Sequence, residues 1–407
     1  KQLGALPPAA MAGLRPQQTR QMPPAAMAGM TADQMSFMPP DAFNGFRANQ
    51  VEELSARAFS ELGPQQFGAL SPAAVAGISP QQIRRTPPAA MSQMSSQQVG
   101  RLSADAMARV NADQLEAIPA AALAGLRAAQ VEEIAARAFG GLEADQVGAL
   151  PATAMRGLEP GQLRAMQPRA IGAMSAQQLR QVPAEAVAGM KPDQVTALPR
   201  EVLGAMKPSQ AAELSRRTVG ALEKAQIAAL APAAVGELSA GQISAIDPAA
   251  VAGIDAEQIE EIPTELIDAI TPEQVAELQP DTLAGFTDSL LGELSEDQAA
   301  ALSLVQVNAL TEDQIDALED DVAEIVEETS VDFTAAAAAA DEATVDAINA
   351  AAAAAAAQAN AAASIAEATL IAAAAQEAAE ATLTQFDAVT AAETEYGVIE
   401  AEYEAAE

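Results

Sequence analysis

An eight-residue repeat constrains this chain more than any other feature of its sequence. From Pro7 to Val326 the sequence divides into 40 consecutive octads without an insertion or deletion. With the residues of each octad numbered one to eight, position five is a large apolar residue in 36 octads and position eight is apolar in 39. Because residues spaced i, i+3 lie on one face of a helical turn, these two positions predict a buried helical stripe.

The other octad positions predict that each helix is short. The octad Thr271–Leu278 shows the pattern: a capping residue, then Pro272, then the acidic Glu273 on the positive end of the helix. In one continuous helix, eight residues at about 100° each overshoot two turns by about 80°, so the apolar stripe would wind around the rod. A proline every eight residues would also remove backbone hydrogen bonds. We therefore expect each octad to form one helix of about six residues and a tight corner.

A second period lies on top of the first. Position four is Gln in alternate octads from Gln18 to Gln274, in 17 cases out of 17, whereas the intervening octads mostly carry Ala there and often Gly at position seven. This alternation predicts an all-α fold, an α-solenoid of short helices with an 8-residue repeat and a 16-residue coil of two helices. About 20 coils at a spacing of roughly 8–10 Å would give a stack of about 160–200 Å. The Gly and Ala positions would allow close backbone approach between coils.

The glutamines are the most regular polar feature, and Gln146, Gln162, Gln178 and Gln194 represent them. We interpret them as a structural ladder, in which the amides bond neighbouring amides or the backbone groups left unpaired at helix ends. The alternative is a repeat scaffold whose Gln face binds a protein or glycan. The scarcity of aromatic side chains around the ladder favours the structural interpretation.

Composition excludes several function classes. The chain has no Cys, His or Trp, so thiolate metal sites, imidazole ligands and Ser-His-Asp or Cys-His catalysis have no central residue. A net charge of −35 would repel nucleic acid and anionic membranes. No apolar run approaches the roughly 20 residues of a membrane span. We expect no enzyme activity, no catalytic residue and no cofactor.

The charge is divided along the sequence. Residues 1–226 contain 21 basic and 18 acidic residues, a net charge of +3, and the remainder contains 38 acidic residues and no basic one. One interpretation is a solvated surface, and another is that the acidic end of one molecule meets the basic end of the next. A weak Ca²⁺ site at Glu319, Asp320, Asp321 and Glu324 is a third, although these residues lack the spacing and turn glycine of an EF-hand.

The C-terminal part has a different composition. We predict a solenoid over residues 1–326, an acidic linker at 327–333 and an Ala-rich helical tail at 334–407. The tail is predicted to be helical because Ala has the highest helix propensity, and we expect it to serve in assembly. Lys1 to Leu6 already fits positions three to eight of an octad, so the array starts without a cap. Such an end predicts either preceding repeats or a covering subunit.

The octads Thr271–Leu278, Ser295–Leu302 and Thr311–Leu318 resemble the LTxxQVxAL octapeptide arrays of very large bacterial surface and secreted proteins. The resemblance extends over about 320 residues and implies an extracellular or cell-surface location, with an adhesin-like or filament-forming role. We therefore expect a structural protein, a rigid solenoid subunit or segment of a filament or surface appendage that assembles with itself through its ends and its tail. Other surface proteins or glycans are further candidate partners. In the alternative of a binding scaffold, the acidic face would bind Ca²⁺.

Overall fold

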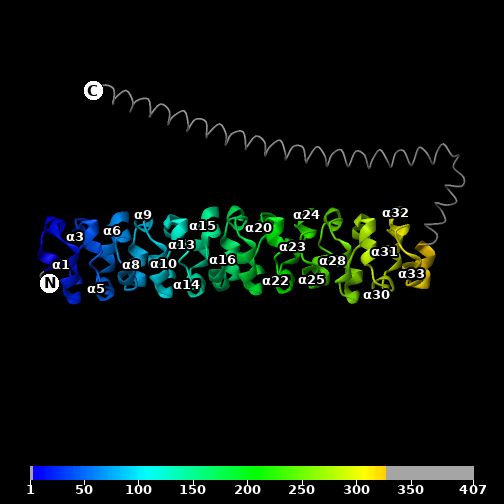
Figure 1. Ribbon diagram of the computed structural model, residues 1–407, viewed down its shortest axis with the longest axis horizontal. Coiled ribbons are helices and arrows are strands. Elements are labelled where there is room, and N and C mark those ends of the chain that lie inside the picture. Colours follow the sequence, from blue (N-terminus) through cyan, green and yellow to red (C-terminus); the bar gives the residue numbers. More distant parts are fainter. Residues whose placement is uncertain (1–2, 327–407) are drawn as a thin grey trace, which may run out of the picture. The chain divides into compact units, whose positions relative to one another are not determined.

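The computed structural model describes residues 3–326, and these form an all-helical array of short helices with no strand among them. The predicted fold class, an α-solenoid of short helices, is confirmed for this part of the chain. In Figure 1 the helices follow one another along one axis, from α1 (Pro16–Gln21) at one end to α33 (Glu312–Asp316) at the other. The predicted linker and Ala-rich tail, 327–333 and 334–407, lie outside the described residues.

The bounds of the helices follow the octads, which we number from Pro7 onward. The even octads contain α1 (Pro16–Gln21), α3 (Ala32–Ser36), α5 (Ala48–Glu52), α6 (Pro64–Gly68), α8 (Pro80–Arg85), α10 (Ser96–Arg101), α12 (Ala112–Ala117), α14 (Ala128–Glu133), α15 (Ala144–Ala149), α16 (Pro160–Ala165), α18 (Ala176–Gln181), α20 (Pro192–Thr196), α22 (Pro208–Ala212), α24 (Lys224–Ile227), α26 (Ala240–Ile243), α28 (Ala256–Glu260), α29 (Pro272–Glu277), α30 (Asp288–Leu291) and α32 (Leu304–Val307). The odd octads contain η2 (Pro8–Gly13), α2 (Pro24–Met27), α4 (Pro40–Phe43), η3 (Ala56–Glu61), α7 (Pro72–Val75), α9 (Pro88–Met91), α11 (Ala104–Met107), α13 (Ala120–Leu123), η4 (Ala136–Gly141), η5 (Ala152–Gly157), α17 (Pro168–Ile171), α19 (Ala184–Val187), α21 (Arg200–Leu203), α23 (Arg216–Val219), α25 (Pro232–Gly236), α27 (Pro248–Val251), η6 (Thr264–Ala269), η7 (Pro280–Gly285), α31 (Glu296–Ala300) and α33 (Glu312–Asp316), and η1 (Leu3–Ala5) precedes the first octad.

Every helix from η2 to α33 begins at position two of its octad, as the sequence predicts. The residue at position one is extended and acts as the N-cap, as at Thr31, whose hydroxyl accepts the backbone N–H of Gln34. Proline is tolerated at position two because its missing N–H is one that the first helical turn leaves unpaired. No described residue has a positive φ, so the corners are made by extended residues and not by left-handed glycines.

The number of octads in a coil differs from the prediction. The main helix–helix contacts in the described array join helices three octads apart, such as α16 with η4 and α14 with η5. A coil therefore contains three short helices, and the predicted 16-residue coil of two helices is wrong. At three octads per coil, the 40 octads form about 13 coils, and a spacing of roughly 8–10 Å gives a stack of about 105–130 Å.

Because a coil contains an odd number of octads, the two-octad alternation places different types of octad against each other in neighbouring coils. Each Gln-bearing even octad lies against odd octads in the coils before and after it. A side chain at Gly45 or Gly77, both at position seven of odd octads, would overlap the carbonyl oxygen of Pro16 or Ala48 at position two of the even octad below. The predicted close approach at these glycines is confirmed, and its cause is contact between coils.

The core is one continuous cluster made by positions five and eight. These side chains are buried along the array and become partly exposed only toward the two ends of the described stretch, for example at Leu14 and Leu310. Large fully buried residues such as Phe43, Phe139 and Met107 occupy position five. The stack therefore has a continuous apolar interior, and its exposed side chains are mainly those of the other octad positions.

Candidate functional site: buried glutamines and surface notches

The glutamine side chains lie inside the solenoid. Gln146 is 3% exposed, and its Oε1 accepts the backbone N–H of Glu143, the N-cap of its own helix, at 3.0 Å. Its Nε2 donates to the carbonyl oxygens of Leu115 (3.1 Å), Glu116 (3.0 Å) and Ile118 (2.7 Å). One amide thus bonds a backbone N–H at the start of its own helix and backbone carbonyls at the end of a helix in the coil below. These are the two places where a short helix leaves backbone groups unpaired.

The same arrangement recurs at the other three glutamines named above. Gln162, Gln178 and Gln194 are at most 2% exposed, and each Nε2 donates to the carbonyls 31 and 28 residues earlier at 2.7–2.8 Å. The amides bond backbone groups of the chain and not one another. Because these amides are buried and fully used by the fold, the Gln face offers no polar group to a glycan or peptide.

The geometry tolerates changes in the sequence alternation. Gln298 and Gln314 occupy position four of odd octads and still donate to carbonyls 31 and 28 residues earlier. In two other odd octads position four is a threonine. Thr218 and Thr282 each donate a hydrogen bond to one carbonyl 28 residues earlier. Gln18 is the exposed exception, and the backbone N–H of Arg15 is the partner of its Oε1.

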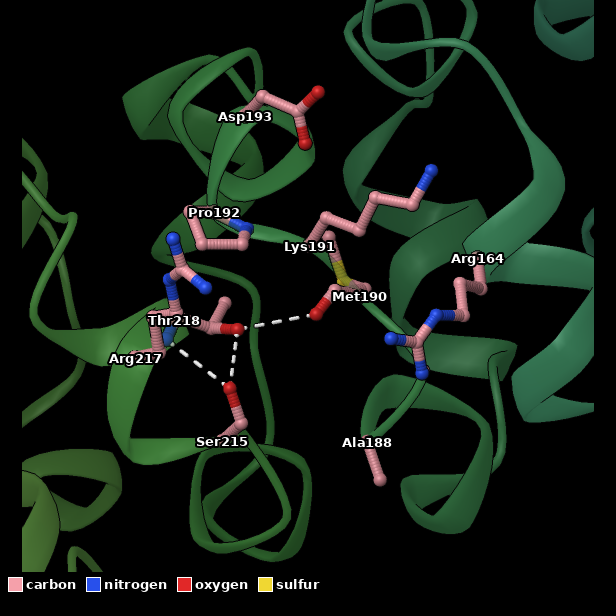
Figure 2. A pocket seen from close by; sticks show the side chains of 10 residues that line it. Arg164, Ala188, Met190, Lys191, Pro192, Asp193, Ser215, Arg217 and Thr218 are labelled. Atoms are coloured by element: carbon pink, nitrogen blue, oxygen red, sulfur yellow. Dashed lines mark hydrogen bonds between the residues drawn. The ribbon is translucent and has the colours of Figure 1, made fainter.

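The notches on the surface lie at corners without a facing glutamine. Each notch is bounded by three segments of the chain. Two are consecutive: positions six to eight of one octad and positions one to three of the octad that follows it. The third is the first helical turn of the octad three places further along the chain. The basic notch, with a volume of about 510 Å³, is lined by Arg164, Lys191, Arg217 and Asp193 around the Thr218 hydroxyl. Figure 2 shows these side chains around the opening, with Thr218 bonded to the Met190 carbonyl. The threonine reaches one carbonyl where a glutamine would cover two.

A second notch repeats this geometry 64 residues later. The acidic notch, about 560 Å³ in volume, is lined by residues 252–257, 279, 281 and 282, and the Thr282 hydroxyl donates to the Ile254 carbonyl at 2.7 Å. Its charged side chains are Asp255, Glu257 and Asp281. Lys191 and Arg217 of the basic notch correspond to Asp255 and Asp281, so the same local structure carries opposite charge at two places in the array.

The charged residues of both notches are exposed, and the described residues form only two ion pairs. These are Arg169 with Glu143 at 2.6 Å and Arg200 with Glu201 at 2.9 Å. The hydrogen bond from Arg200 lowers the pKa of Glu201, and the pKa of Glu273 is lowered by its own backbone N–H and then by the Thr271 hydroxyl. Both carboxylates are on the surface, where such shifts reflect local hydrogen bonds.

The predicted calcium ligands lie at the last described corner. Glu319 and Asp321 line a further notch with Glu296 and Asp297, and Asp320 lies beside them. Within residues 3–326 no group of three or more carboxylates is arranged to hold a metal ion, and this covers Glu319, Asp320, Asp321 and Glu324. Every buried side-chain nitrogen or oxygen in the same range has a hydrogen-bond partner.

The sequence reasoning identified the glutamines but missed the notches. The residue at position four of the odd octads could have predicted the notches. Ala is too short to bond the two carbonyls that a Gln bonds, and Thr bonds only one of them. The charge reversal between Lys191 and Asp255 was also visible in the sequence, but its meaning depends on knowing that these corners are equivalent.

Comparison with known proteins adds no relative. No protein-family model matches the chain, and no curated protein matches it. None of the helices within residues 3–326 has the length and apolarity that crossing a membrane requires.

Proposed function

We propose that this protein is a structural, non-enzymatic rod that assembles with copies of itself, as a subunit or segment of a bacterial extracellular filament or surface appendage. One observation carries the proposal: the repeat uses its buried polar groups to join coil to coil and leaves charged, open notches as its surface features. The extracellular location depends on the resemblance of the octads to bacterial surface arrays.

The surface supports a protein partner over a small-molecule substrate. The notches are lined by exposed charges, and no described carboxylate or amine lies in an enclosed apolar site of the kind that tunes a catalytic group. The regular spacing of the coils gives a stiff element, because glutamines such as Gln146 bond the start of their own helix and the end of a helix in the coil below. A stiff rod with separated charges is suited to ordered side-by-side or end-to-end assembly.

Analytical ultracentrifugation and negative-stain microscopy of the purified chain test the proposal. We expect filaments or ordered bundles that grow with protein concentration and weaken as salt screens the surface charges. Deleting residues 334–407 tests separately whether the predicted tail contributes to the assembly. Single rods at every concentration and salt would refute self-assembly.

A further inference from the structure

We propose that the basic notch of one copy pairs with the acidic notch of a second copy, so that Lys191 and Arg217 face Asp255 and Asp281 across the contact. The inference depends on the proposed self-assembly and specifies its contact surface. The occupant of the basic notch is thus a carboxylate surface of the same protein, and not an unrelated anion.

The first argument is structural equivalence. The two notches are separated by 64 residues, eight octads, and every lining residue except Arg164 has its counterpart. Met190 and Ile254 supply the carbonyl, and Thr218 and Thr282 supply the hydroxyl that donates to it, at 3.1 and 2.7 Å. Lys191 and Asp255 are both extended residues at a corner, and Arg217 and Asp281 lie in the short helix that faces this corner, α23 (an α-helix) and η7 (a 3-10 helix). The charge is reversed at two of these positions, from Lys191 and Arg217 to Asp255 and Asp281, whereas Asp193 and its counterpart Glu257 are both acidic.

The second argument is that the chain leaves these charges unpaired. Arg164, Lys191 and Arg217 give the basic notch three cations against the one carboxylate of Asp193. The acidic notch has three carboxylates and no cation. None of these residues belongs to the two ion pairs found within residues 3–326. Two notches eight octads apart on one rod, between two and three coils, cannot reach each other, whereas two rods side by side can bring them together.

The third argument selects this acidic notch from those available. A notch between them, lined by Glu223, Lys224 and Asp247, has mixed charge. The notch with Glu319 and Asp321 is also acidic, but Ser295 stands there at the position of Lys191. Of these three notches, only the one at Asp255 and Asp281 reverses both cationic positions. One exposed ion pair contributes little, so we expect binding to depend on several pairs acting together and on repetition along the assembly.

Charge exchange in the full-length chain tests the pairing. The K191D/R217D variant reverses the basic notch, and the D255K/D281R variant reverses the acidic notch. We expect each to raise the critical concentration for assembly at least about tenfold, because like charges then face each other. The variant with all four changes has the composition and net charge of the original chain, and we expect it to assemble again at nearly the original concentration.

A matched control separates this contact from net charge. Arg85 and Arg101 are exposed beside corners that Gln114 and Gln130 fill, so R85D/R101D makes the same charge change away from both notches. Far-ultraviolet circular dichroism checks that each variant keeps its helices, since Asp255 also caps α28 (Ala256–Glu260).

The outcomes are distinct. If the unchanged chain never assembles, the proposed function itself fails. If the chain assembles but the notch variants behave like R85D/R101D, the pairing of the notches is wrong while self-assembly stands. If both reversals weaken assembly but the four-fold exchange does not restore it, the cations have some other partner and the inference is overturned.

Discussion

Replacing Gln146 by Ala tests the main structural role of the repeat. The change removes the acceptor of the Glu143 N–H and the donor to the Leu115, Glu116 and Ile118 carbonyls, all between 2.7 and 3.1 Å. A net contribution of about 0.5–1.5 kcal/mol per hydrogen bond gives roughly 1–4.5 kcal/mol for two or three such bonds. Water that enters the opened corner satisfies part of the lost bonding, so we expect about 1–3 kcal/mol of local destabilisation.

The assay has to detect a local change, because long repeat arrays do not unfold in a single two-state step. Hydrogen exchange followed by mass spectrometry reports the free energy of opening for each segment. A loss of about 2 kcal/mol corresponds to roughly 30-fold faster exchange in the peptides that contain the Glu143 amide and the end of α12 (Ala112–Ala117). Tryptophan fluorescence is not an option, since the chain contains no Trp.

Gln18 provides the control at the same octad position. It is exposed and bonds only the backbone N–H of Arg15, so Gln18→Ala should change exchange by less than about 0.5 kcal/mol. Both variants lose the bond that caps their own helix, and only Gln146→Ala also loses the bonds between coils. Equal effects of the two changes would therefore show that the bonds between coils do not stabilise the array.

Two further predictions compare neighbouring or equivalent sites. Gly125→Ala should destabilise the array by about 1–3 kcal/mol in thermal or urea unfolding, because the new methyl group overlaps the Ser96 carbonyl, whereas Gly148→Ala, with its nearest neighbour at 3.6 Å, should stabilise α15 by about 0.5–1 kcal/mol. Leu290 stands where the alternation calls for Gln, so Leu290→Gln should cost less than about 1 kcal/mol, while Leu291→Gln in the core should cost about 2–5 kcal/mol. A loss of stability for Gly148→Ala, or equal losses at the two leucines, would contradict the corresponding argument.

The sequence alone determined the local structure of the repeat. It predicted where each helix begins, because a capping residue at position one and a proline at position two act within a single turn. It also predicted the core, since the i, i+3 spacing of positions five and eight fixes one face of a short helix regardless of what lies beside it. The helix α29 (Pro272–Glu277) and its cap Thr271 follow the predicted pattern residue by residue.

The tertiary structure decided how many octads make a coil. Local preferences fix each helix and each extended corner, but a coil closes after two or three helices according to how well the coils pack, and no single octad contains that information. The two-octad alternation therefore suggested a coil of two helices, whereas the contact of Gly45 with Pro16 and the bonds of Gln146 join coils of three. The same closure brings Arg217 to the corner at Lys191, which lies three octads earlier, so that both line one notch, and their separation in sequence does not show this.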